Sequence, residues 1–170
     1  MDRTGIVAAL TALAHDLHAH GLSADMYVVG GAAIALAFDE RRSTRDVDAV
    51  FVPKAEVYAA AARVAEQQAL PDGWLNDAVK GFLAGEDTGA REVLDLPGLR
   101  VQVASPGTLL SLKVLAHRVG EDDHDVRLLA RSLGLTTADA VLALAVDRIG
   151  ETRLTPAARF FVEQVMGEAD

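Results

Sequence analysis

The sequence predicts an α/β (α+β) protein: a small mixed β-sheet with helices packed on it, followed by a C-terminal helical region. Two observations favour this class. Short apolar runs alternate with helical periodicity over residues 1–104, whereas residues 105–170 carry helical periodicity alone. The chain has 170 residues, of which 51% are hydrophobic, so it can bury a core without disulfide support. We therefore expect an α/β core over 1–104 and a helical region over 105–170, joined in one compact protein.

The elements of the first half follow from apolar spacing and from chain breakers. Apolar residues that follow Ile6 at spacings of four and three lie on one helix face, and Gly21 ends this helix. The segment 74–91 has weak periodicity and is expected to be a loop with one helical turn near 76–80. Alternating runs on either side of Pro97-Gly98 predict a β-hairpin. The expected elements are a helix over 5–20, a strand over 26–29, a helix over 32–38, a strand over 46–52, a helix over 54–69, and hairpin strands over 92–96 and 99–104.

Capping residues set the helix boundaries of the second half. Ser105-Pro106 and Thr155-Pro156 each place an N-cap before a proline at the first helical position. Thr136 and Asp139 resemble a capping box. The expected helices run over 106–119, 123–133, 137–149 and 156–166, with Asp122 or Asp123 capping the second.

The charge balance and the missing cysteines narrow the classes of function. The chain carries 16 basic and 25 acidic residues, a net charge of −9, which disfavours sequence-independent capture of nucleic acid but allows a local contact with an RNA end. Without cysteine there are no disulfides, thiolate metal sites or cysteine nucleophiles. No apolar run reaches the roughly 18 residues of a membrane span, and no signal-peptide pattern opens the chain. We expect a soluble, cytoplasmic protein with no membrane partner.

One segment, residues 27–52, carries the residues typical of chemistry on phosphates. Gly30-Gly31 lies where a strand gives way to a helix, so a ligand can approach the backbone and the helix N-terminus can bind phosphate. Asp46 and Asp48 stand two positions apart on the next strand, on one face and about 6.6 Å apart. Two such carboxylates repel each other unless they share a cation, and Mg²⁺ prefers oxygen ligands. The pair predicts a metal site; a solvated sheet edge is the alternative.

The length of the chain allows the glycines and the aspartates to meet. The short helix carries the chain about 10 Å away from the glycines, and residues 39–45 can span up to about 23 Å on the return. We therefore expect the strand with Asp46 and Asp48 to start beside Gly30-Gly31 and to run antiparallel to the strand that precedes them. The phosphate cradle and the metal carboxylates would then share one site.

Gly-Gly at a strand–helix junction followed by Asp-x-Asp resembles the nucleotidyltransferase superfamily with the DNA-polymerase-β-like fold. The stretches 28–37 and 41–48 are similar to small bacterial nucleotidyltransferases related to abortive-infection and toxin–antitoxin toxins. The stretch 105–113, Ser-Pro-Gly-Thr-Leu-Leu-Ser-Leu-Lys, is similar to the same branch, as is the acidic cluster 122–125 that follows Arg118. The similarity covers roughly residues 26–133, with little information over 74–91.

The resemblance implies a role for each matching residue. Asp46 and Asp48 would hold Mg²⁺, and Lys113 would neutralise triphosphate charge. One of Asp122 and Asp125 would orient or deprotonate the acceptor. The nucleotide would be bound by Gly30, Gly31, Ala32, Arg45 and Lys113.

Several of these residues also have a plainer interpretation. Lys113 lies in the middle of a predicted helix, where a surface lysine is the alternative. Asp122 and Asp125 stand at a helix start, where acidic residues stabilise the helix dipole. Arg118 and Arg127 are the simplest partners for their carboxylates.

Two positions depart from the family pattern. Ala32 stands where relatives often carry a phosphate-binding serine, so backbone amides or the hydroxyl of Ser43 or Thr44 would have to replace it. A third carboxylate is expected on a later strand, where this chain has Gln102. Glu92 or Asp95 would have to substitute for it.

The resemblance implies transfer of a nucleoside monophosphate from an NTP to an acceptor hydroxyl. In the similar toxins the acceptor is the 3′ end of tRNA or, in some relatives, a protein hydroxyl, and the partner is an antitoxin protein. The alternative is a catalytically degenerate protein that binds a nucleotide or a protein partner. A Rossmann unit is disfavoured because Gly30-Gly31 lacks the G-x-G-x-x-G spacing, and neither a P-loop nor a G-x-S-x-G elbow is present.

Overall fold

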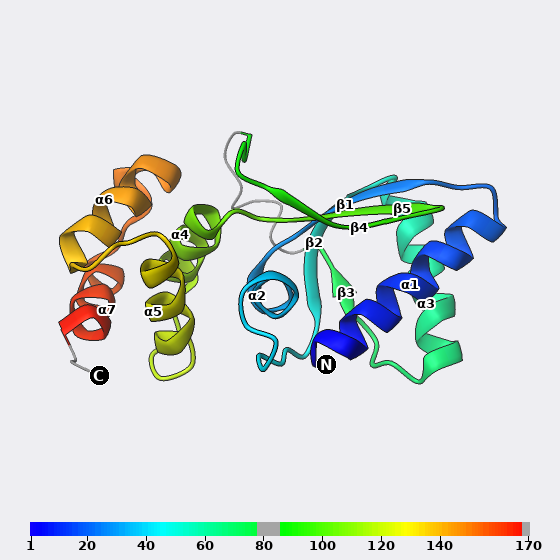
Figure 1. The fold of residues 1–170 in the computed structure, drawn as a ribbon, viewed down its shortest axis with the longest axis horizontal. Helices are drawn as coiled ribbons and strands as arrows, with labels where there is room; N and C mark the ends of the chain where they lie inside the picture. Colours follow the sequence, from blue (N-terminus) through cyan, green and yellow to red (C-terminus); the bar gives the residue numbers. More distant parts are fainter. Residues whose placement is uncertain (78–85, 168–170) are drawn as a thin grey trace. The chain divides into compact units, whose positions relative to one another are not determined.

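The computed structural model describes residues 1–77 and 86–167, which fall into two compact units. The first unit contains residues 1–77 and 90–104, and the second contains residues 86–89 and 105–167. The chain is the expected α/β protein, with a five-stranded mixed sheet, N-terminal helices and a C-terminal region of four α-helices in this described part (Figure 1).

The first unit contains the sheet and three α-helices among its described residues. Its elements are α1 (Arg3–Ala19), β1 (Ala24–Val28), α2 (Gly30–Ala37), β2 (Val47–Val52), α3 (Lys54–Gln68), β3 (Leu75–Asn76), β4 (Arg91–Leu96) and β5 (Leu99–Val103). The strands lie in the order β3-β2-β1-β5-β4. β1 pairs antiparallel with β2, Val28 opposite Ala49, and parallel with β5. The expected antiparallel return of the chain is confirmed.

Side chains alternate between two different faces of the sheet. One face is buried, with Met26, Val47 and Val101 each at most 2% exposed, and α1, α2 and α3 lie on this side of the sheet (Figure 1). Residues of the other face are half-buried or exposed, among them Asp48 and Gln102. A period of two on half-covered strands produces this division. The aspartate pair therefore belongs to the face opposite the three helices of this unit, which we call the open face.

The predicted hairpin is confirmed, whereas the loop expected before it, over residues 74–91, is partly wrong. Pro97-Gly98 turns β4 into β5. Gly98 has φ +93°, and an added Cβ would lie 2.5 Å from the Ala14 carbonyl of α1, so only glycine fits. Leu75 and Asn76 form β3, parallel to β2, where a loop and a helical turn were expected. Residues 78–85 lie outside the described part of the chain.

The second unit is helical throughout its regular elements. These are α4 (Pro106–Ala116), α5 (Asp123–Ser132), α6 (Ala138–Ile149), the 3-10 helix η2 (Glu151–Arg153) and α7 (Pro156–Gly167). The Ser105 hydroxyl accepts a hydrogen bond from the Thr108 N–H, as a cap should. The N-cap of α6 is Thr137, which corrects the expected capping box at Thr136.

Two further boundaries differ from expectation. α4 ends at Ala116, three residues early, because His117 leaves the helical conformation and its ring stacks on Phe161 of α7 at a centroid distance of 5.0 Å. Asp122 is the N-cap of α5, but its side chain makes no capping bond. Among the helices of residues 1–77 and 86–167, none combines the length and apolarity needed to cross a membrane.

Candidate functional site

The corner between β1 and α2 is built on glycine. Gly30 has φ +63°, a left-handed conformation that allows the chain to turn directly from strand to helix. The Val29 N–H just before it donates to the Asp48 carbonyl at 2.9 Å. This bond places the Asp-x-Asp segment against the corner.

The Asp48 carboxylate packs directly on this corner. Its Oδ2 atom lies 3.1 Å from the position that a Cβ on Gly30 would take. The next glycine is as tightly covered, since a Cβ on Gly31 would lie 2.9 Å from the Thr44 hydroxyl oxygen. Because both glycines lack a side chain, a carboxylate and a hydroxyl approach the start of α2.

Thr44 is the hydroxyl residue that the structure brings to the corner. Its Oγ1 donates to the Asp46 carbonyl at 3.1 Å, and its backbone N–H donates to the Met1 carbonyl at 2.9 Å. Of the two hydroxyls that could replace the missing serine, Thr44 lies beside Gly31. Ala32 is only 1% exposed and has no hydroxyl, so contacts to a phosphate would fall to Gly30, Gly31 and Thr44.

Asp46 lies one residue before β2, on the same side as Asp48. Its Oδ2 accepts a hydrogen bond of 3.1 Å from Nδ2 of Asn76. Asn76 pairs in register with Asp48 across β2 and β3, so the three side chains share one part of the open face. We did not predict Asn76 from the sequence, because a two-residue strand in a weakly periodic segment has no recognisable signal. Arg45, just before Asp46, is exposed.

The two carboxylates and their surroundings fit a divalent cation with oxygen ligands. Both aspartates are half-buried, and Asp48 is packed against the glycine cradle. Carboxylate and amide oxygens suit Mg²⁺. Within residues 1–77 and 86–167, however, no group of three or more His, Cys, Asp and Glu side chains could hold a metal ion. Among the described residues, the acidic ligands that this site can provide for a cation are therefore two, Asp46 and Asp48.

Within the described part of the chain, the strand order keeps the candidate third carboxylates away from that pair. Gln102 is on β5, which β1 separates from β2, about 10 Å away at two strand spacings. Glu92 and Asp95 are on β4, one strand further again. Neither acid is placed to substitute for the third carboxylate.

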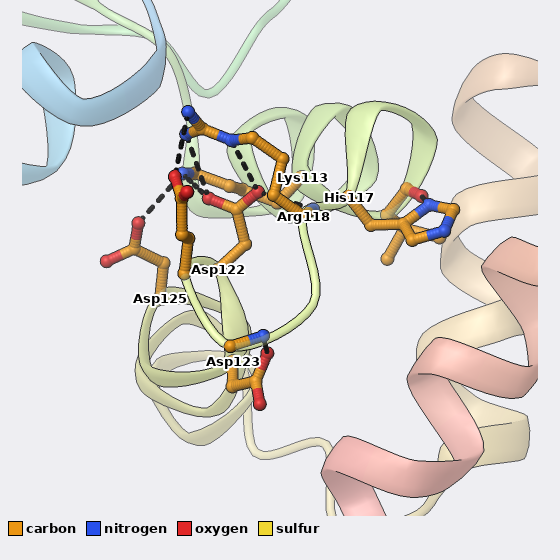
Figure 2. Close-up of polar contacts among 9 residues, drawn as sticks. Lys113, His117, Arg118, Asp122, Asp123 and Asp125 are labelled. Atoms are coloured by element: carbon orange, nitrogen blue, oxygen red, sulfur yellow. Dashed lines mark hydrogen bonds and ion pairs between the residues drawn. The ribbon is translucent and has the colours of Figure 1, made fainter.

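The second unit holds a cluster of charges, which we call the Lys113 cluster: the buried Lys113, Asp122 and Asp125, and the exposed Arg118 (Figure 2). The ammonium of Lys113 lies 2.5 Å from Asp122 Oδ1 and 2.8 Å from Asp125 Oδ2. Lys113 is 8% exposed, and the two aspartates are 2% and 1% exposed. The interpretation of Lys113 as a surface lysine is therefore wrong. Its role at the triphosphate stays a prediction.

Arg118 completes the cluster from the loop between α4 and α5. Its backbone N–H donates to Asp122 Oδ2 at 2.9 Å, and its guanidinium lies 3.4 Å from the same atom. The predicted pairing of Arg118 with an acid is confirmed. Arg127 donates from Nε to the Val165 carbonyl at 3.1 Å, which connects α5 to α7.

The Asp122 carboxylate is stabilised in its charged form. Burial alone would raise its pKa, but the hydrogen bond and charge of Lys113, followed by the bonds from Arg118, outweigh burial and lower the pKa below its usual value. A carboxyl group with a lowered pKa in the folded state stabilises the fold above its unfolded-state pKa of about 3.9. This contribution is lost as the pH falls through the folded-state pKa, so the second unit should weaken in acid.

Replacing Gly30 by alanine tests the contact between the corner and Asp48. The left-handed conformation should cost about 1 kcal/mol of unfolding free energy, and the new Cβ should push the Asp48 carboxylate away and weaken Mn²⁺ binding. Gly21→Ala is the matched control, since Gly21 has φ +69° with nothing within 4 Å of the added Cβ. It should lose similar stability in urea unfolding but keep its Mn²⁺ affinity. Equal Mn²⁺ binding by both variants would contradict this picture.

The predicted site residues thus form two groups, one in each unit. In the first unit Asp48 packs on Gly30, and Asp46 accepts a hydrogen bond from Asn76, which pairs in register with Asp48. The Lys113 cluster forms in the second unit. No protein-family model, curated protein or solved structure matches the chain. A functional assignment therefore rests on the chemistry of these two groups and on the sequence pattern.

Proposed function

We propose that the protein is an Mg²⁺-dependent nucleotidyltransferase, which moves a nucleoside monophosphate from an NTP to an acceptor hydroxyl. The contact of the Asp48 carboxylate with Gly30 carries this proposal, because it joins the aspartate pair to a glycine-built helix start. A divalent cation held by the aspartates would lie beside this helix start, where the oxygens of a phosphate can also bind.

In this proposal, the catalytic groups come from the first unit. The acceptor oxygen would form a bond to the α-phosphorus, the bond to the bridging oxygen would break, and pyrophosphate and the acceptor proton would leave. Asp46 and Asp48 would hold Mg²⁺, which when bound neutralises phosphate charge. The amides at the start of α2 lack partners inside the helix and can donate to phosphate oxygens, as can the Thr44 hydroxyl. Catalysis would come mainly from positioning and electrostatics.

The acceptor we propose is the 3′ end of a tRNA, as the resemblance to toxin–antitoxin nucleotidyltransferases implies. With a net charge of −9, RNA contacts would have to be local. Arg41 and Arg45 are exposed on the segment that leads to Asp46 and could contact phosphates there. Arg100 forms an ion pair with Asp25 at 2.7 Å, and Arg91 donates to the Ala37 carbonyl. An antitoxin protein would be the partner that restrains this activity.

A binding protein with the same fold is the second candidate. It is favoured by the buried Ala32, which has no hydroxyl, and by the aspartate pair that no further acid joins among the described residues. Such a protein would bind a nucleotide or a protein partner without transferring anything. It has no use for two carboxylates held close together, which is why we rank it second.

Labelled nucleotides separate the two candidates. The protein is incubated with each α-³²P-labelled NTP and Mg²⁺, together with total tRNA in one arm and protein extract in another. An enzyme is expected to label one acceptor class with one preferred NTP and to lose this activity in EDTA. Nucleotide binding without label transfer in either arm would favour the binding protein.

A further inference from the structure

Asn76 presents a neutral hydrogen-bond donor to the first carboxylate of the aspartate pair. Its Nδ2 donates to Asp46 Oδ2 at 3.1 Å. An amide orients a carboxylate without cancelling its charge, whereas a lysine or arginine would compete with a cation for it. Asp46 lies just before β2 begins, so this bond restrains a side chain that the strand itself does not fix.

The chain on both sides of Asn76 is anchored, so the amide is held in place. On one side, the Trp74 carbonyl accepts from the Val47 N–H at 2.7 Å, and the buried Trp74 ring donates from Nε1 to the Ala61 carbonyl at 3.1 Å. Together with the pairing of β3, these bonds tie the residues before Asn76 to β2 and α3.

On the other side, Asp77 is bound to α3. Its Oδ1 accepts from the Tyr58 hydroxyl at 2.7 Å, and its Oδ2 lies 2.5 Å from the Lys54 ammonium. The backbone N–H of Asp77 also donates to the Tyr58 oxygen at 3.2 Å. A side chain between two such anchors keeps its direction, and groups that orient metal ligands act through this kind of preorganisation.

We propose that Asn76 is a positioning residue, whose amide holds the Asp46 carboxylate in the orientation that binds the divalent metal. This inference rests on the proposed function, since it assumes that Asp46 is a metal ligand. Asn76 acts through Asp46 and assists the metal site from β3.

Mn²⁺ binding without nucleotide tests the role, with free Mn²⁺ measured by electron paramagnetic resonance. Asn76→Leu keeps the size of the side chain and removes the donor, and should weaken Mn²⁺ binding about tenfold. If the leucine variant folds poorly, Asn76→Thr takes its place. Threonine suits a strand but is too short to reach Asp46, so this variant should show the same loss of Mn²⁺ binding. Without metal, the Tm of the Asn76 variant should stay close to that of the wild type. An unchanged Tm distinguishes loss of the Asp46 orientation from damage to the fold.

Two reference variants make the outcomes separable. Asp46→Asn should lose most Mn²⁺ affinity, whereas Asp16→Asn, which breaks the ion pair with Arg63 between α1 and α3, should bind Mn²⁺ like the wild type. If Asp46→Asn weakens binding and the Asn76 variants do not, the positioning role is wrong and the proposed function stands. If Asp46→Asn itself binds Mn²⁺ normally, the metal site of the proposed function is wrong.

Discussion

Asp48→Asn is expected to lower the rate of nucleotidyl transfer by about 10²–10³-fold and to leave the fold intact. The substitution keeps the shape of the side chain and removes the charge that packs on Gly30. Without that charge the proposed site should hold Mg²⁺ and the triphosphate poorly. Because it also removes repulsion between two neighbouring acids, the metal-free variant should unfold at the same temperature as the wild type or slightly higher.

The measurement combines turnover with metal-induced stabilisation. Saturating Mg²⁺ raises the Tm of a protein that binds it only when folded, so the wild type should show a shift that the variant lacks. Asp25→Asn is the matched control, because Asp25 is on β1 of the same sheet, at the end opposite Gly30. It should keep both activity and the Mg²⁺ shift. Full transfer activity in Asp48→Asn would rule out the assignment of this residue.

The sequence predicted the parts of the fold that depend on local spacing. Helical periodicity after Ile6, the Pro97-Gly98 turn and the proline caps each act over a few residues, and the structure has these elements close to their expected places. The antiparallel return to Gly30 could also be predicted, because chain length and strand geometry leave few other routes.

What could not be predicted depends on contacts between distant residues. β3 has two residues and exists only because Leu75 pairs with Val47 of a strand far back in the chain. The hydrogen bond from the Asn76 amide to Asp46 therefore could not be predicted from the sequence. A lysine in the middle of a helix has the same sequence pattern whether it is exposed or buried. The burial of Lys113 depends on its contacts with Asp122 and Asp125, which only the structure shows. Adjacent threonines made the cap at Thr137 ambiguous by one residue.

Lys113→Met should cost about 3–5 kcal/mol of unfolding free energy, the second large effect we expect. The ammonium is almost fully buried between Asp122 and Asp125, and methionine has a similar length without the charge. Removing the ammonium leaves two buried carboxylates near each other. Arg118 is then the remaining cation that the structure places on Asp122. The contacts between α4 and α5 should weaken, with faster amide exchange in both helices.

Lys54→Met is the matched control, because it removes the same charge from an equally short contact. Lys54 lies 2.5 Å from Asp77, but its side chain is 55% exposed, so water replaces the lost partner and stability should barely change in urea unfolding. Adding Asp122→Asn and Asp125→Asn to Lys113→Met should recover part of the lost stability, since the two buried carboxylates that have lost the Lys113 ammonium are then neutral. If Lys113→Met instead keeps its stability and loses only nucleotide binding, the cluster does not stabilise the second unit, and Lys113 serves the triphosphate as the sequence resemblance implies.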